Sequence, residues 1–169
     1  GQSFPRERIF PYKCMKWAGA VHEHLVPTRD LVKIRSDVAV EHQFKERNGS
    51  NLERNLRILL KEWNRSPGDS RTCMYIANSY FDLGTYKPEN YDLCIPWYER
   101  RIYDYSYTEW PEETFKAMEN LAKIYLFRKD AQTLDKWACE LVSTDPQRRE
   151  GYYYRMCVAV LKGDKASAM

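Results

Sequence analysis

The chain has 169 residues, of which 43% are hydrophobic, enough for one domain with a core or for a small domain plus part of another. Its 27 basic and 24 acidic residues leave a formal net charge of +3, which disfavours nucleic acid and anionic membranes as partners. No apolar run approaches the roughly 20 residues that span a bilayer, so we expect no transmembrane segment. The five cysteines form no CxxC pair, which favours buried thiols in the reducing cytoplasm over disulfides or a structural zinc site.

Short strand-like patterns occupy the chain from residue 6 to about residue 44. They are ERIF, then KWAGAVHEHLV (residues 16–26), then DVAVEHQF, with Pro11, Gly19 and Pro27 as breaks. In the last of these, Val38, Val40 and His42 would share one strand face. This region is too short to hold a core by itself.

Beyond residue 48 the hydrophobic period becomes that of helices. Leu52, Leu56, Leu59, Leu60 and Trp63 form one stripe of an amphipathic helix that stops before residues 66–68, Ser-Pro-Gly. Further helices are predicted over residues 70–84, 91–103, 111–128, 131–142 and 146–162. We expect Asp69 or Ser70 to cap the second helix, and Pro111 and Pro146 to occupy first turns.

Internal repeats indicate how these helices pack. The tetratricopeptide pattern fits Met118, Leu121, Ala122, Tyr125, Leu134, Ala138, Leu141 and Pro146, and an earlier stretch from Cys73 to Tyr98 fits as well. Ala77 and Ala122 would let helices approach closely, while Tyr80 and Tyr125 would fill the space between pairs. The predicted fold is therefore mainly α, a tetratricopeptide-like solenoid of antiparallel helix pairs, with an unrelated helical bundle as the alternative.

Two of the three histidines lie in KWAGAVHEHLV. On a single strand, His22 and His24 would point one way and Glu23 the other. A lone pair of histidines has no specific metal-site spacing. From spacing alone, a polar strand edge is the simpler interpretation.

The string RERIFPYKCMKWAGAVHEHLV, residues 6–26, resembles a segment near the end of the catalytic domain of family 2 glycosyltransferases. The matching positions are Arg6, Arg8, Phe10, Trp17, Gly19, Val21, His22 and Glu23. Residues 40–42, Val-Glu-His, supply the hydrophobic-x-His strand that usually follows. The Arg-Asn-Leu start of the helices (Arg54, Asn55, Leu56) and the later YERRI, with Trp110, Glu112 and Glu113 after it, also look like these enzymes. The resemblance covers nearly the whole chain, in order.

This resemblance implies a transferase of the GT-A type that moves a hexosyl group from a nucleotide sugar. In such enzymes a divalent metal, commonly manganese or magnesium, neutralises the donor diphosphate. The resemblance assigns His22 or His42 to the metal, Glu23 to the acceptor as orienting group or base, and Arg8 and Trp17 to substrate binding. The structural alternatives are a core position for Trp17 and Phe10 and a surface ion pair for Arg8.

The chain departs from the family pattern because it contains no Asp-x-Asp and no Gly-rich nucleotide loop. Family members carry these upstream, so we expect a C-terminal portion of a longer polypeptide. Residues 1–47 would be the remnant of the catalytic domain. Residues 48–164 would be helical repeats that bind a glycan or protein acceptor, a partner protein or a second subunit. We expect this span alone to be inactive and to bind no metal. The alternative is a free-standing peptide-binding module whose concave, tyrosine-rich face holds its ligand without catalysis.

Overall fold

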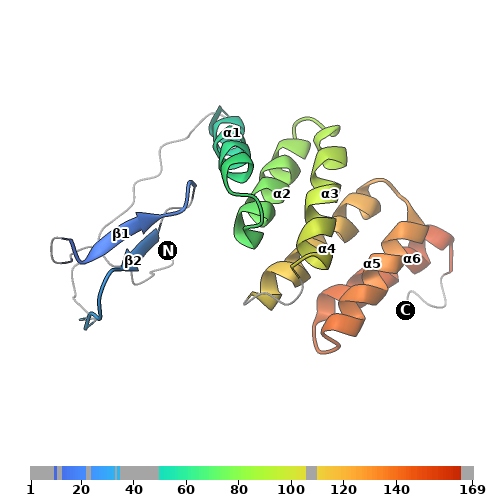
Figure 1. The fold of residues 1–169 in the computed structure, drawn as a ribbon. Coiled ribbons are helices and arrows are strands. Elements are labelled where there is room, and N and C mark those ends of the chain that lie inside the picture. Colours follow the sequence, from blue (N-terminus) through green and yellow to red (C-terminus); the bar gives the residue numbers. More distant parts are fainter. Residues whose placement is uncertain are drawn as a thin grey trace. The chain divides into compact units, whose positions relative to one another are not determined.

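The computed structural model describes residues 10, 13–21, 24–32, 34, 50–105 and 110–164. Its contacts divide the chain into two compact units, Gly1–Asn51 and Leu52–Met169. A two-stranded sheet belongs to the first unit and a series of helices to the second (Figure 1). The chain is thus mainly helical. The assignment of residues 1–47 to a catalytic domain stays a prediction.

The strand-like segment around KWAGAVHEHLV forms two strands. β1 (Met15–Ala18) pairs antiparallel with β2 (His24–Pro27). The chain turns after β1 at Gly19, one of the predicted breaks, which has a φ of 92°, a left-handed conformation that suits glycine. Residues 22 and 23 lie outside the described residues, so the faces predicted for His22 and Glu23 stay a prediction. The strand predicted around His42 lies outside the described residues.

Six helices lie within the described residues: α1 (Ser50–Arg65), α2 (Ser70–Gly84), α3 (Asn90–Tyr103), α4 (Pro111–Phe127), α5 (Ala131–Thr144) and α6 (Arg149–Lys162). The predicted helices are confirmed, most of them to within two residues at each end. The exception is the start of α6, because Asp145 forms a turn by accepting hydrogen bonds from the backbone N–H groups of Gln147 and Arg148. Pro146 lies in that turn, so its predicted first-turn position is wrong.

Side-chain caps explain where two of the helices begin. The Asp69 carboxylate accepts a hydrogen bond from Thr72 N at 2.7 Å, as predicted for α2, and Asp130 caps α5 in the same way through Thr133 N at 3.1 Å. Pro111 occupies the first turn of α4, where its missing N–H has no helical partner. These local signals set the helix boundaries before any tertiary packing is considered.

Each helix from α2 to α6 packs against its neighbours along the chain (Figure 1), and α4 also contacts α2 and α6. Only residues 128–130 connect α4 to α5, and so short a turn between packed helices reverses the chain. Ala77 and Ala122 are fully buried in the shared core, while Tyr80 and Tyr125 are partly buried and pack against it. The assignment of these helices to tetratricopeptide-like repeats stays a prediction. The ring of Trp63 meets that of Trp97 edge to face, with centroids 5.2 Å apart, and so joins α1 to α3.

The cysteines are mostly internal. Cys14, Cys73 and Cys94 are buried, which confirms the prediction for these three, whereas Cys139 is exposed. Burial raises the pKa of Cys73 and of Cys94 to about 12, because a thiolate is poorly solvated in the core. Within the part of the chain that the structure describes, no helix is long and apolar enough to cross a membrane.

Candidate functional site

Of the residues that the sequence assigns to catalysis or binding, the structure describes one. Trp17 lies in β1 opposite Leu25, and 66% of it is exposed. Arg8, His22, Glu23 and His42 lie outside the described residues.

The alternative core role for Trp17 and Phe10 is wrong, because Phe10 is also exposed, at 37%. Most of Trp17 is thus accessible to a ligand. Its predicted role in substrate binding stays a prediction.

The most heavily bonded side chain in the helical unit is Arg101, near the end of α3. It is fully buried, and its Nη1 donates to Tyr105 O at 3.0 Å and to Thr114 Oγ1 at 2.8 Å. Its Nη2 donates to Trp110 O at 3.0 Å, and its Nε lies 3.5 Å from the Glu113 carboxylate. A buried guanidinium is tolerated only when paired and hydrogen-bonded, as here. Arg101 thus holds both ends of the connection between α3 and α4, a structural rather than a catalytic arrangement.

A second buried network lies one turn earlier on α3. Tyr98 Oη donates to Asn78 Oδ1 at 2.8 Å and accepts from Asn120 Nδ2 at 2.8 Å, so that α2, α3 and α4 are joined. Burial raises the pKa of Tyr98 well above that of an exposed phenol, because the phenolate would be unsolvated. The phenol therefore stays protonated and donates its hydrogen bond over the whole physiological pH range.

An exposed cluster lies where α2 and α4 begin. Arg71 Nε donates to Tyr75 Oη at 2.9 Å, and the guanidinium lies 5.6 Å from the Tyr75 ring centre and 5.9 Å from that of Trp110. The Trp110 residue is 54% exposed. A cation between two rings is stabilised by their negative faces, so these three side chains form an ordered surface patch. No sequence motif predicted Arg71 or Tyr75 as site residues, because this patch depends on tertiary packing.

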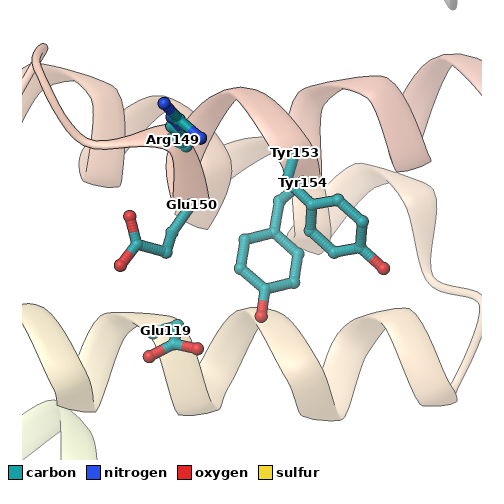
Figure 2. A pocket seen from close by; sticks show the side chains of 5 residues that line it. All are labelled: Glu119, Arg149, Glu150, Tyr153 and Tyr154. Carbon is teal, nitrogen blue, oxygen red and sulfur yellow. The ribbon is translucent and has the colours of Figure 1, made fainter.

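The pocket in Figure 2 lies between α4 and α6 and has a volume of about 270 Å³. It is lined by Glu119, Arg149, Glu150, Tyr153 and Tyr154. The tyrosine rings extend from α6 toward α4, where Glu119 lies, whereas Arg149 is directed away from α4. Because the pocket is open and has aromatic walls, it suits contact with a side chain of a bound polymer.

Both carboxylates of the pocket already have cationic partners. Lys116 and Lys123 lie 2.6 and 2.7 Å from the Glu119 carboxylate. Partial burial alone would raise the pKa of Glu119, but the hydrogen bonds from the two lysines outweigh it, so this pKa is lowered. A hydrogen bond from Arg148, at 2.7 Å, likewise lowers the pKa of Glu150. Both groups are therefore ionised at neutral pH, which suits binding and does not suit a general acid.

Arg148 also connects the starts of α4 and α6. It contacts Glu112 at 2.7 Å, and its guanidinium lies 3.7 Å from the centre of the Phe115 ring. This contact fixes α6 against α4 at one end of the pocket. The acidic first turn of α4 is stabilised both by the helix dipole and by this arginine.

Among the described residues, no three His, Cys, Asp or Glu side chains come together as metal ligands. The two predicted ligands, His22 and His42, lie outside those residues. No protein-family model matches the chain, and no curated protein matches it. The described site thus offers aromatic surfaces and paired charges, which are features of a binding surface.

Proposed function

We propose that the chain is the C-terminal portion of a nucleotide-sugar-dependent glycosyltransferase, in which the helical unit binds the acceptor, a partner chain or a second subunit. The observation that carries this proposal is the bonding around Arg101. Tyr98, Arg101, Trp110 and Glu113 belong to the two segments, YERRI and WPEE, that resemble these enzymes. All four contribute atoms to the contacts that join α3 to its neighbours. The shared packing of the two segments is consistent with their acting as one unit, as the resemblance implies.

The helical unit is assigned in this proposal to tetratricopeptide-like repeats. The contacts of α4 with both α2 and α6 support it, because every second helix of such an array lies beside the next. The full burial of Ala77 and Ala122 supports it too, since small residues are needed where helices approach closely. A stack of helix pairs presents one extended surface, which is the property that a binding region needs.

The N-terminal segment supplies the transfer chemistry in the proposal. His22 or His42 would hold a manganese or magnesium ion, which would neutralise charge on the donor diphosphate. Arg8 contacts the same diphosphate, and Glu23 orients the acceptor or takes its proton. Trp17, which is exposed in β1, binds a sugar or another substrate group through its side chain. The described residues provide no metal ligands of their own.

Transfer of a labelled sugar by the polypeptide expressed from the natural gene tests the proposal. Donors are the common nucleotide sugars, tested with manganese and with magnesium, and acceptors are a glycan panel and a protein panel. His22→Ala and Glu23→Ala should each lower the rate by roughly 100-fold or more, with an unchanged far-ultraviolet circular dichroism spectrum. The 169-residue span alone should transfer no sugar. Absence of transfer from every donor would contradict the function, and full activity of both variants would contradict the site assignment.

A second candidate function, peptide binding without catalysis, is favoured by the pocket between α4 and α6. Tyr153 is 50% exposed there and can contact a bound side chain. Tyr153→Ala should then weaken binding of peptides selected from a random library by about tenfold, which corresponds to 1.4 kcal/mol. Tyr86→Ala, which removes an exposed ring in the turn before α3, is the matched control. Sugar transfer by the natural polypeptide would exclude this second function.

A further inference from the structure

The solvent-exposed surface of α6 carries four aromatic or apolar side chains, one of which, Tyr153, also lines the pocket. Tyr152 and Tyr153 are each 50% exposed, Met156 is 43% exposed and Val160 is 64% exposed. Tyr152, Met156 and Val160 recur at every fourth residue and so lie along one helix face, with Tyr153 beside them. We call these four side chains the α6 stripe. The opposite face of α6 is buried in the core, for example at Tyr154.

The first and last described helices, α1 and α6, differ in the side chains that they expose to solvent. On α1 the exposed side chains include four charged ones, Glu53, Arg54, Arg57 and Lys61, and its leucines Leu56 and Leu59 are buried. The α6 stripe has aromatic and apolar side chains at the corresponding exposed positions. A continuous row of exposed apolar side chains on one helix marks a contact surface.

The charge around the α6 stripe is positive. Arg149 and Arg155 are exposed on α6, and neither forms an ion pair with any residue in the described part of the chain. The carboxylate of Glu150 is bonded to Arg148 at 2.7 Å and is not available to them. Lys162, near the other end of the helix, is bonded to Asp135 at 2.8 Å. Two unpaired guanidinium groups therefore border an apolar stripe.

We infer that the α6 stripe docks an amphipathic helix of a second polypeptide whose flanking side chains are acidic. A row of side chains spaced by four residues fits the groove of a packed helix, and its apolar contacts supply affinity. Carboxylates on the flanks of the incoming helix pair with Arg149 and Arg155, which supplies orientation and specificity. This inference uses only the exposed side chains of α6, so it holds whether or not the chain takes part in sugar transfer.

Two other occupants fit the charges less well. Pairing of α6 with α6 of a second copy would bring Arg149 and Arg155 of both copies to one interface, where the single carboxylate of α6, that of Glu150, is already bonded to Arg148. An anionic bilayer would be attracted only weakly, since the whole chain carries a formal net charge of +3. The experiment below therefore also detects dimer formation and vesicle binding.

The test uses the chain and two synthetic fluorescein-labelled helical peptides of about 16 residues. The peptides share one leucine face and differ only on its flanks, where one has glutamates and the other has lysines. By fluorescence anisotropy at low salt we expect the glutamate peptide to bind and the lysine peptide to bind at least about tenfold more weakly. Met156→Glu should abolish binding, because it places a charge in the stripe. Tyr86→Glu, at a residue that is 75% exposed in the turn before α3, should leave binding unchanged.

Charge reversal separates docking from simple destabilisation. Arg155→Glu should weaken binding of the glutamate peptide and strengthen binding of the lysine peptide, with an unchanged thermal midpoint. The inference is overturned if neither peptide binds, if both bind equally, or if Met156→Glu has no effect. It is also overturned by a dimer in sedimentation equilibrium that Met156→Glu dissociates, which would assign the stripe to a second copy. Co-sedimentation with phosphatidylserine vesicles that Met156→Glu abolishes would assign it to a membrane surface.

Discussion

Asn120 of α4 donates a hydrogen bond from its amide nitrogen to the phenol oxygen of Tyr98 in α3, at 2.8 Å. Both side chains are buried. The Tyr98 hydroxyl in turn donates a hydrogen bond to Asn78 Oδ1 in α2. Three consecutive helices are thus joined by one line of hydrogen bonds. Buried polar groups of this kind are costly when any one partner is removed.

Tyr98→Phe should therefore lower the free energy of unfolding by about 1–3 kcal/mol, because the two asparagine side chains lose a buried partner. Tyr103→Phe is the matched control, since this residue of the same helix is 58% exposed. The control should change stability by no more than about 0.5 kcal/mol. Urea denaturation of both variants gives the comparison. Equal effects would mean that the network adds no stability.

Gly84 and Gly151 are both required for close packing, but against different neighbours. A Cβ at residue 84 would lie 2.5 Å from Cε1 of the Tyr91 ring, whereas one at residue 151 would lie 2.8 Å from the backbone nitrogen of Val142. Alanine normally stabilises a helix relative to glycine by about 1 kcal/mol, yet overpacking costs about 1–3 kcal/mol. Gly84→Ala and Gly151→Ala should each lower the thermal midpoint.

A second substitution distinguishes the two glycines. Tyr91→Leu should recover much of the stability lost in Gly84→Ala, because it removes the ring that clashes. Val142→Ala should not recover Gly151→Ala, because the clash there includes backbone that no substitution removes. Thermal denaturation of the single and double variants measures both couplings, and equal recovery at the two sites would contradict the packing described.

Thiol reactivity should follow burial. Cys139 is exposed and should be alkylated first by a maleimide in the native chain, before Cys73 and Cys94, which are buried and have a pKa of about 12. The thiolate is the reacting form, so both burial and the raised pKa slow the reaction. Mass mapping of labelled peptides over time gives the order. Early labelling of Cys73 or Cys94 would show that the core opens readily.

Acid should remove the stabilising effect of Glu119. Its pKa is lowered in the folded chain, because Lys116 and Lys123 hold the ionised form despite partial burial. A lowered folded pKa means that the contribution is fully present above the unfolded value of about 4.3 and is lost as pH falls through the folded pKa. Glu119→Gln should therefore be less stable than the wild type at pH 7, and the difference should shrink in acid. A difference that is the same at every pH would contradict the ion pairs.

The helices could be predicted from local signals. The leucine period marked α1, Asp69 marked the start of α2, and Pro111 marked that of α4. The helix predicted over residues 91–103 forms as α3 and runs through Pro96. One local feature ran against expectation, because α6 begins after Pro146 instead of at it. There the turn that Asp145 forms with Gln147 and Arg148 takes the place of a first helical turn, which the preference of proline alone does not reveal.

The buried site could not be predicted in the same way. A charged residue in a helix is expected at the surface, and Arg101 is buried only because the carbonyl groups of Tyr105 and Trp110 converge on it. That convergence is a result of tertiary packing. The pairing of Glu119 with Lys116 and Lys123 follows helical spacing and was visible in the sequence. The pocket was not, since the tyrosines opposite come from another helix.

We propose that catalysis belongs to the N-terminal segment, whereas the Arg101 contacts support the structure. The most direct test compares Glu23→Ala with Arg101→Met in the natural polypeptide and measures both sugar transfer and unfolding. Arg101→Met leaves Glu113 and two carbonyl groups without their buried partner, so it should cost about 3–5 kcal/mol of stability. Glu23→Ala should lose roughly 100-fold or more of the transfer rate at an unchanged thermal midpoint. Full transfer by Glu23→Ala, or a stability loss in it equal to that of Arg101→Met, would contradict the claim.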